Sequence, residues 1–336
     1  MPILPRVAQG RSPIWAAMLV LYLVWGSTYL GIAIAVESIP PFVMASARFL
    51  IAGSILLAWS VARDGRSFAV PTRRQWRDSG IVGALLLGGG MGMVAFGEQT
   101  VPSGIAALLV AMMPVWVAVL GWILLRERLP RLAGIGIVVG FAGVAILVGP
   151  SATGAVDGLD PLGLTALLIS PIAWSLGSLF ASHRADLPGR PLVATGLQMV
   201  LGGGVLAIMA VVSGELADLD PGAITRSSVI AFLYLTIIGS LVAFTAFGWL
   251  LRVAPLPLVT TYAYVNPVVA VILGWIILGE TVDARTALAG AVIIGAVALI
   301  ITSRGRMARS RTGRESPDFK PRTIAADEPA TSPPTA

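Results

Sequence analysis

Hydrophobic residues in this chain form long runs without charge, separated by short polar connections. Nine of these runs contain no Asp, Glu, Lys or Arg: 12–36, 79–97, 99–125, 132–156, 161–182, 191–214, 227–251, 253–279 and 286–303. A tenth run, 38–62, is interrupted only by Arg48. Since about 20 apolar residues in a helix span the hydrocarbon core of a bilayer, each run predicts one transmembrane helix. The runs are much longer than the alternating strands of a membrane barrel, so we predict an all-α membrane protein with ten transmembrane helices.

A fourteen-residue pattern occurs twice. Pro114–Glu127 reads PVWVAVLGWILLRE, and Pro267–Glu280 reads PVVAVILGWIILGE. The offset of 153 residues (267 minus 114) divides the predicted spans into two halves of five. Five is an odd number of crossings, so equivalent helices must cross the membrane in opposite directions. We therefore predict a 5+5 inverted repeat, which is the usual construction of a secondary transporter with its substrate site between the halves.

The repeat also defines the regions of the chain. We expect a short N-terminal segment, two repeats of five spans each, and a tail rich in Arg, Pro and Thr that cannot bury a core and is predicted to be disordered. Their boundaries are 1–13, 14–150, 158–303 and 304–336.

Basic residues concentrate on one side of the predicted membrane. The N-terminal segment, the even-numbered connections and the tail hold 20 of the 23 Lys and Arg residues, whereas the odd-numbered connections hold most of the acidic ones. The positive-inside rule then places both termini in the cytoplasm. The net charge of +6 is explained by this topology, so we expect membrane lipids, and no nucleic acid, as partners.

Composition supports the same class. Hydrophobic residues make up 56% of the chain, charged residues 12%, and the mean hydropathy is +0.87. Such a chain has too little polar surface to cover a water-soluble globule. The chain has no cysteine, which excludes disulfides and thiol chemistry.

Arg48 is the only ionisable residue deep within a predicted span. An unpaired guanidinium there costs at least about 2.5–3.5 kcal/mol, so Arg48 should face the bundle interior or water. One interpretation is a counter-charge for a carboxylate or phosphate of a substrate. The other, which the residue type alone favours, is a structural clamp on helix-end carbonyls or a side chain that reaches the outer interface.

Other polar and aromatic residues predict a cavity. The first span contains Trp-Gly-Ser-Thr-Tyr near its middle, the sixth contains Trp-Ser, and the ninth contains Tyr-Ala-Tyr-Val-Asn beside a proline. Aromatic belts normally lie at the membrane interface, so aromatic residues in mid-span favour a cavity lining. The side chains that we expect to line it are Trp25, Ser27, Tyr29, Arg48, Trp174, Tyr262, Tyr264 and Asn266.

Prolines and acidic residues complete the candidate set. Pro114 and Pro267 lie near the middle of the fourth and ninth spans and predict bends at matching depths, which would suit hinges or gates beside a cavity. Glu98 lies at the outer end of the third span, where we expect a solvated helix end. With no carboxylate expected in mid-membrane, a proton relay is disfavoured.

An enzyme is not expected. The only histidine is His183 at a helix end, and the chain has no phosphate-binding loop, no HExxH and no GxSxG. We predict no catalytic residues, no metal and no cofactor.

Several motifs together resemble one family. They are WGSTY in the first span, VPSGIAALLVAMMPV in the fourth span, the Pro-to-Glu repeat with its endings RERL and GETV, and YAYVNPVVAV in the ninth span. The region from Ile14 to Ser303 resembles the drug/metabolite transporter superfamily in its EamA-domain branch, and within that branch the bacterial YedA-like inner-membrane proteins. The resemblance implies two inverted EamA repeats around a central cavity and export of amino acids, other metabolites or drugs.

We therefore predict a secondary transporter of the bacterial inner membrane, a monomer or homodimer that exports small metabolites such as amino acids or related amphipathic compounds by alternating access. Multidrug efflux, import, and a lipid-handling protein similar to a scramblase remain alternatives.

Overall fold

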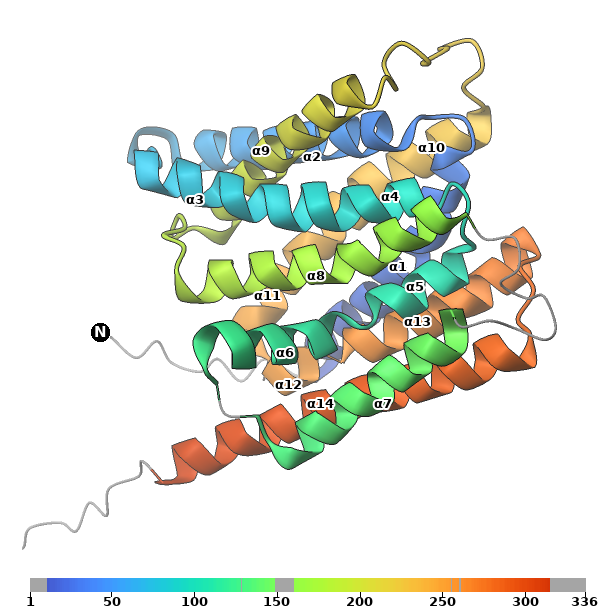
Figure 1. Cartoon of the computed structure of the whole chain (residues 1–336). Helices are drawn as coiled ribbons and strands as arrows, with labels where there is room; N and C mark the ends of the chain where they lie inside the picture. Colours follow the sequence, from blue (N-terminus) through green and yellow to red (C-terminus); the bar gives the residue numbers. More distant parts are fainter. Residues whose placement is uncertain (1–10, 128, 149–159, 255, 260, 315–336) are drawn as a thin grey trace, which may run out of the picture.

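The computed structural model describes residues 11–127, 129–148, 160–254, 256–259 and 261–314. All regular structure in these residues is helical, and the helices form one bundle (Figure 1). The first half comprises α1 (Arg11–Val36), α2 (Pro41–Asp64), η1 (Gly65–Ser67), α3 (Arg73–Gly83), η2 (Ala84–Gly92), α4 (Met93–Gly97), α5 (Ser103–Val110), α6 (Met113–Leu125) and α7 (Arg131–Val148). The second half comprises α8 (Pro161–His183), α9 (Pro191–Val212), α10 (Arg226–Tyr234), η3 (Leu235–Val242), α11 (Ala243–Val253), α12 (Leu256–Val259), α13 (Tyr262–Leu273), η4 (Gly274–Leu278) and α14 (Ala284–Arg314).

Most predicted spans appear as long helices. Within the described part of the chain, nine helices are long and apolar enough to cross a membrane, and Tyr262–Leu278 is a shorter apolar helix. The predicted ninth span is shorter because a turn at Thr261 separates α12 from α13. The chain is thus a multi-pass helical membrane protein. The prediction of ten crossings, the inverted relation of the halves and the cytoplasmic side of the termini stay predictions.

The two prolines differ in their surroundings. The fourth span is broken at Ala111 and Met112, and Pro114 lies in the first turn of α6, where its missing N–H is not needed. Pro267 lies inside α13, five residues beyond the start of that helix. The breaks in the fourth and ninth spans therefore do not occupy equivalent positions relative to the prolines, and a bend at Pro267 itself stays a prediction.

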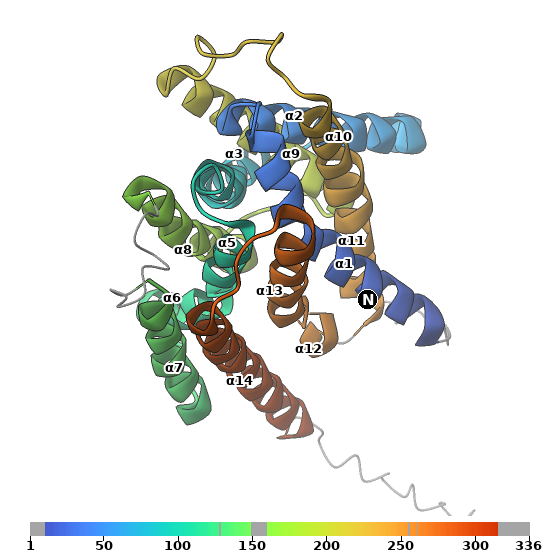
Figure 2. The same ribbon diagram turned by 90° about the vertical axis from the view of Figure 1, so that its right-hand side faces the viewer.

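Packing between the helices follows the division into halves. α2 packs on α9, and α7 packs on α14, at opposite edges of the bundle (Figure 2). Between these pairs, α1 packs on α13, as α8 packs on α5 and α6. In the same way α1 packs on α10 and α11, as α8 packs on η2 and α4. When spans one to five are exchanged for spans six to ten, the pairs α2–α9 and α7–α14 are unchanged and the pairs made by α1 become those made by α8, as a duplication predicts.

Both the third and the eighth span contain a π-helical segment. η2 begins at Ala84 and η3 at Leu235, an offset of 151 residues (235 minus 84). π-Helical turns are rare and occur frequently at functional sites. Here the two segments lie on the central cavity described below, because Met91 of η2 lines it and Ser240 of η3 contacts a residue that lines it.

Glycines allow the backbones of α3 and α9 to approach each other closely. A Cβ atom on Gly83 of α3 would lie 2.4 Å from the carbonyl oxygen of Gln198, and one on Gly202 of α9 would lie 2.7 Å from the carbonyl oxygen of Gly83. No larger residue fits at either position without separating the helices. Gly83 and Gly202 therefore serve close backbone approach, as small residues do in other membrane bundles.

The ends of the bundle carry the short connections. The connections α2–α3, α6–α7 and α8–α9 lie at the left end of the bundle in Figure 1, together with the end of α14. The connections α1–α2, α4–α5, α9–α10 and α13–α14 lie at the right end. We refer to these as the basic end and the acidic end, after the charge distribution of the sequence. α14 continues to Arg314, past the predicted end of the last span, and the rest of the predicted tail lies outside the described residues.

Candidate functional site: a central aromatic cavity

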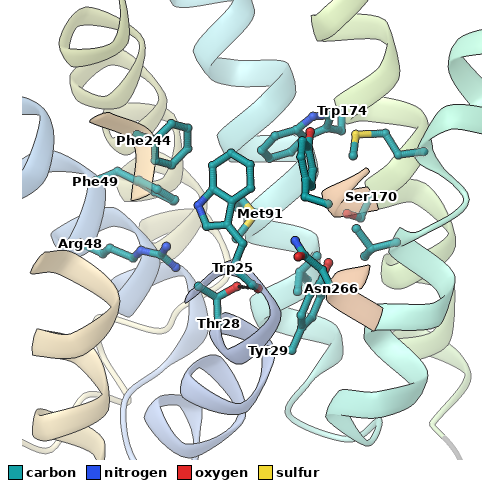
Figure 3. Close-up of a pocket in the computed structure, with 14 residues that line it drawn as sticks. Trp25, Thr28, Tyr29, Arg48, Phe49, Met91, Ser170, Trp174, Phe244 and Asn266 are labelled. Atoms are coloured by element: carbon teal, nitrogen blue, oxygen red, sulfur yellow. Dashed lines mark hydrogen bonds between the residues drawn. The ribbon is translucent and has the colours of Figure 1, made fainter. Parts of the chain in front are cut away.

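A cavity lies in the middle of the bundle, between the two halves (Figure 3). Its empty volume is about 660 Å³, part of which is open to solvent. Its lining comes from both halves and consists of Trp25, Thr28, Tyr29, Arg48, Phe49, Met91, Val94, Val110, Met113, Ser170, Trp174, Phe244, Tyr262 and Asn266. Six of the eight residues predicted from the sequence are in this set: Trp25, Tyr29, Arg48, Trp174, Tyr262 and Asn266.

The first helix places its residues on the cavity through the helical period. Trp25, Thr28 and Tyr29 are at positions i, i+3 and i+4, which share one face of α1. Ser27 is on another face. Its hydroxyl donates to the carbonyl oxygen of Leu23 at 2.7 Å and lies 2.6 Å from the hydroxyl of Tyr234. Ser27 therefore lines an apolar groove between α1 and α10, outside the central cavity.

Trp25 is the centre of an aromatic cluster. Its ring lies edge-on to Tyr262 at 5.0 Å and to Phe244 at 5.4 Å between centroids. Edge-to-face packing of this kind holds rings in fixed orientations and contributes beyond the area that it buries. Trp174 of α8 lies on the other side of the cavity, and its ring packs on Gly90 of η2. The cavity is therefore bounded by an indole from each half.

Arg48 is buried, with 3% of its surface exposed, and its guanidinium faces the cavity (Figure 3). Its Nε donates to the hydroxyl of Ser240 at 2.9 Å, and Ser240 donates in turn to the carbonyl oxygen of Leu235 at 3.1 Å. The guanidinium also lies 4.9 Å from the ring centre of Phe49. Within the described residues no carboxylate pairs with Arg48. The Nε edge of the guanidinium is thus anchored to the second half of the protein, and the guanidinium is part of the cavity wall.

Two polar side chains on the cavity lack partners. The side-chain oxygen of Asn266 and the hydroxyl of Ser170 are buried and accept or donate no hydrogen bond within the part of the chain that the structure describes. Both line the same cavity as Arg48. Burying a polar group without a partner costs free energy, so these groups favour an occupant that can bond to them.

Tyr264 is outside the cavity. It is two residues beyond Tyr262, about 200° further round the helix, and its side chain interacts with Thr261 instead. The aliphatic and sulfur-containing lining residues, among them Met91 and Val110, carried no polar signal in the sequence. Ser170 could have been found, because it precedes Pro171 in mid-span as Asn266 precedes Pro267.

Glu98 is not a solvated helix end. It follows α4 directly, yet only 6% of its surface is exposed and neither carboxylate oxygen has a hydrogen-bond partner among the described residues. The expectation of solvent exposure was wrong because Glu98 is buried near groups from distant parts of the sequence, among them Ala33 of α1 and Glu280. In the described ranges, no group of three His, Cys, Asp or Glu residues that could hold a metal ion occurs.

Comparison with known proteins assigns the family. The model of the EamA-like transporter family matches this chain twice, over residues 13–149 and 161–302. The chain belongs to the EamA-like transporter family. It is a membrane transporter of the drug/metabolite transporter type, as the sequence motifs indicate.

Individual relatives cover most of the chain. The "Uncharacterized inner membrane transporter YedA" of Escherichia coli K12 is 39% identical over 289 residues, which are 86% of this chain and 90% of that protein. A "Probable amino-acid metabolite efflux pump" of Salmonella typhimurium is 28% identical, over 85% of this chain and 93% of the relative. A solved crystal structure, 22% identical, covers 89% of this chain and 99% of that chain with a TM-score of 0.58. That likeness concerns the fold alone.

Proposed function

We propose that this EamA-family member is a secondary transporter that exports amino acids or related small amphipathic metabolites across a bacterial inner membrane by alternating access. The observation that carries the proposal is the central cavity, which combines one anchored guanidinium with aromatic walls and two unpartnered polar groups. Small-molecule sites are typically apolar concavities with a few placed polar groups. The relative named as an amino-acid metabolite efflux pump supports the same substrate class.

The lining suggests how such a substrate would bind. Arg48 would hold a carboxylate, because a guanidinium recognises planar anions through paired hydrogen bonds. The oxygen of Asn266 and the hydroxyl of Ser170 would take the donor hydrogens of an ammonium or hydroxyl group. The rings of Trp25, Trp174 and Tyr262 would cover an apolar side chain. A substrate that fits all three groups has a carboxylate, an ammonium or hydroxyl group and an apolar side chain, as a zwitterionic amphipathic metabolite does.

The packing of the fourth and ninth spans supports alternating access. At the acidic end α5 packs on α13, with Gly104 against Val271, and the carboxylate of Glu280 accepts the amide hydrogens of Ser103 and Gly104 at 2.7 and 3.0 Å. Toward the basic end, α6 packs on α7, α8 and α14, whereas among the described residues it makes at most slight contact with α13. We infer a conformation closed at the acidic, external end.

The test is transport by the purified protein in proteoliposomes. A mixed pool of amino acids, nucleosides and cationic dyes is offered at zero potential, and mass spectrometry identifies what crosses. We expect zwitterionic or anionic amphipaths to move selectively. Movement of cationic dyes would favour multidrug efflux, uptake in cells would favour import, and exchange of lipid probes without solute movement would overturn the proposal in favour of a lipid-handling protein.

The variant Arg48→Ala should lower transport of the selected substrate at least about tenfold, since a hydrogen bond to a charged group is worth about 1.5–3 kcal/mol. Arg63→Ala on the same helix is the matched control, because Arg63 is exposed at the basic end. Unchanged transport by folded Arg48→Ala would make Arg48 a structural clamp and refute its role in binding.

A further inference from the structure

The most unusual polar group outside the cavity is Glu98, at the acidic end of the third span. The residue is 94% buried (100 minus the 6% that is exposed), and neither carboxylate oxygen has a hydrogen-bond partner among the residues that the structure describes. A buried carboxylate that accepts no hydrogen bond is costly when charged and much less costly when neutral.

The groups that surround Glu98 come from three other elements. Glu280, after η4, repels its charge, and Tyr29 of α1 interacts with it from the cavity side. Ser103, at the start of α5, belongs to the same cluster: a Cβ atom on Gly274 would lie 2.4 Å from Oε2 of Glu280 and 2.9 Å from the hydroxyl of Ser103. That hydroxyl is completely buried and also has no partner within the described ranges.

Electrostatics act in one direction at this position. Burial and the neighbouring charge of Glu280 both raise the pKa of Glu98 well above its usual range; the backbone of Ala33, which forms no hydrogen bond with the carboxylate in this structure, lowers it only in part. Glu280 itself is held by two amide donors at the start of α5. Of the two carboxyl groups, Glu280 is therefore the one with donors for a negative charge, and Glu98 is the one that needs a proton.

We propose that Glu98 is a proton-binding site beside the substrate cavity, and that protonation of Glu98 accompanies closure of the external side. This inference rests on the proposed function as a secondary transporter. When α5 separates from α13, water reaches Glu98 and its carboxyl group ionises. When the two helices close, one Oε atom takes one proton from external water and the side chain changes from charge −1 to neutral.

The position of the site connects it to transport. Tyr29 lines the cavity and is close enough to Glu98 to interact with it electrostatically, so the proton enters the protein near the substrate space. An excess of protons outside then favours closure of the external side, the step by which an exporter that has released its substrate leaves the outward-open conformation. The site thus predicts that external pH sets the balance between the open and closed conformations of the external side, because the proton is taken from and returned to external water.

The test uses a reporter that needs no substrate. The chain has no cysteine, so Val271→Cys creates a single thiol at the contact between α13 and α5. A membrane-impermeant maleimide is added outside intact cells at pH values from 5 to 8. Maleimide reacts with the thiolate, so the labelling rate of any cysteine rises with pH. Rates at position 271 are therefore divided by those of Ala217→Cys, an exposed position in the α9–α10 connection.

We expect the normalised labelling rate at position 271 to rise at least about tenfold from pH 5 to pH 8, since the equilibrium between two states changes up to tenfold per pH unit between the pKa values of the linked group. In Glu98→Gln, which resembles the protonated form, the rate should stay low at every pH. Glu37→Gln, an exposed carboxylate near the same end, is the matched control and should keep the pH response.

Each other outcome is decisive. A rate that is independent of pH in the reporter background, or that keeps its pH response in Glu98→Gln, overturns the inference. A response to sodium ions at fixed pH in place of a response to protons also overturns it. If the pH response is lost only in Glu98→Gln while no solute crosses proteoliposomes, the proton site stands and the proposed function fails. If solutes cross proteoliposomes but the labelling rate shows no pH response, the proposed function stands and the proton site fails.

Discussion

The contact between α3 and α9 allows a sharp test of the fold through Gly83→Ala. The added Cβ would lie 2.4 Å from the carbonyl oxygen of Gln198 and 2.9 Å from the amide nitrogen of Gly202, whereas ordinary contacts of this kind begin at 3.4 Å. Both neighbours are backbone atoms of α9, so no side-chain rotation can relieve the overlap. The helices must separate by about 1 Å, which loosens the packing around them.

The free-energy balance of Gly83→Ala has two opposing terms. Overpacking costs about 1–3 kcal/mol, and replacing glycine by alanine within a helix returns roughly 0.5–1 kcal/mol. We expect a net destabilisation of about 1–2 kcal/mol, which corresponds to a decrease of a few degrees in the melting temperature. Thermal unfolding of the detergent-solubilised protein, followed by tryptophan fluorescence, measures the shift.

Gly80→Ala is the matched control on the same helix. The nearest atom to its Cβ would be the side-chain Cδ1 of Leu201 at 3.5 Å, an ordinary contact. This variant gains the same helix propensity without the overlap, so its melting temperature should be unchanged or slightly higher. Equal melting temperatures for Gly83→Ala and the native protein would show that α3 and α9 are not packed as described.

Two further variants test helix starts at the acidic end. Glu280→Ala leaves the amides of Ser103 and Gly104 without their acceptor and should destabilise the protein by about 1–2 kcal/mol in the same thermal assay. Glu280→Gln keeps one acceptor oxygen and should lose less stability. An unchanged melting temperature in both variants would contradict the capping role of Glu280. Asp283 accepts the amide hydrogen of Thr286 at 2.7 Å, and this bond lowers the pKa of Asp283. A lowered pKa means that the charged form stabilises the fold above the usual Asp range and that this contribution disappears on acidification. Asp283→Ala should therefore have a lower melting temperature than the native protein at pH 7, and the difference between the two melting temperatures should shrink as the pH falls below about 3.9. A difference that stays constant with pH would refute the role of the charge.

Much of the architecture could be predicted because membrane spans need only length and absence of charge. The sequence could not show that the ninth span is divided at Thr261, since its apolar run continues without interruption through that turn. Trp25, Tyr29 and Arg48 were predictable as cavity residues because aromatic and charged groups are unusual in mid-span. The positions of Ser27 and Tyr264 depend on helix rotation, which hydropathy does not determine when every face is apolar.

The burial of Glu98 was unpredictable for a related reason. A carboxylate at the end of an apolar run normally reaches water, whereas Glu98 is buried near Ala33 of α1 and Glu280, which are far from it in the sequence. Ser170 and the aliphatic lining residues were missed because a small hydroxyl or an alkyl side chain looks the same in sequence whether it faces lipid, a neighbouring helix or a cavity.

The bond between Arg48 and Ser240 has a consequence for how the protein is made. Arg48 is in the second span and its partner is in the eighth, 192 residues later. During synthesis the second helix therefore enters the bilayer before Ser240, which accepts the hydrogen bond from Arg48, exists; an unpaired guanidinium there costs about 2.5–3.5 kcal/mol. That helix should stay shallow, or close to the insertion machinery, until the eighth helix arrives. The arginine that gives the cavity its charge thus also makes the final assembly of the two halves a late, shared event.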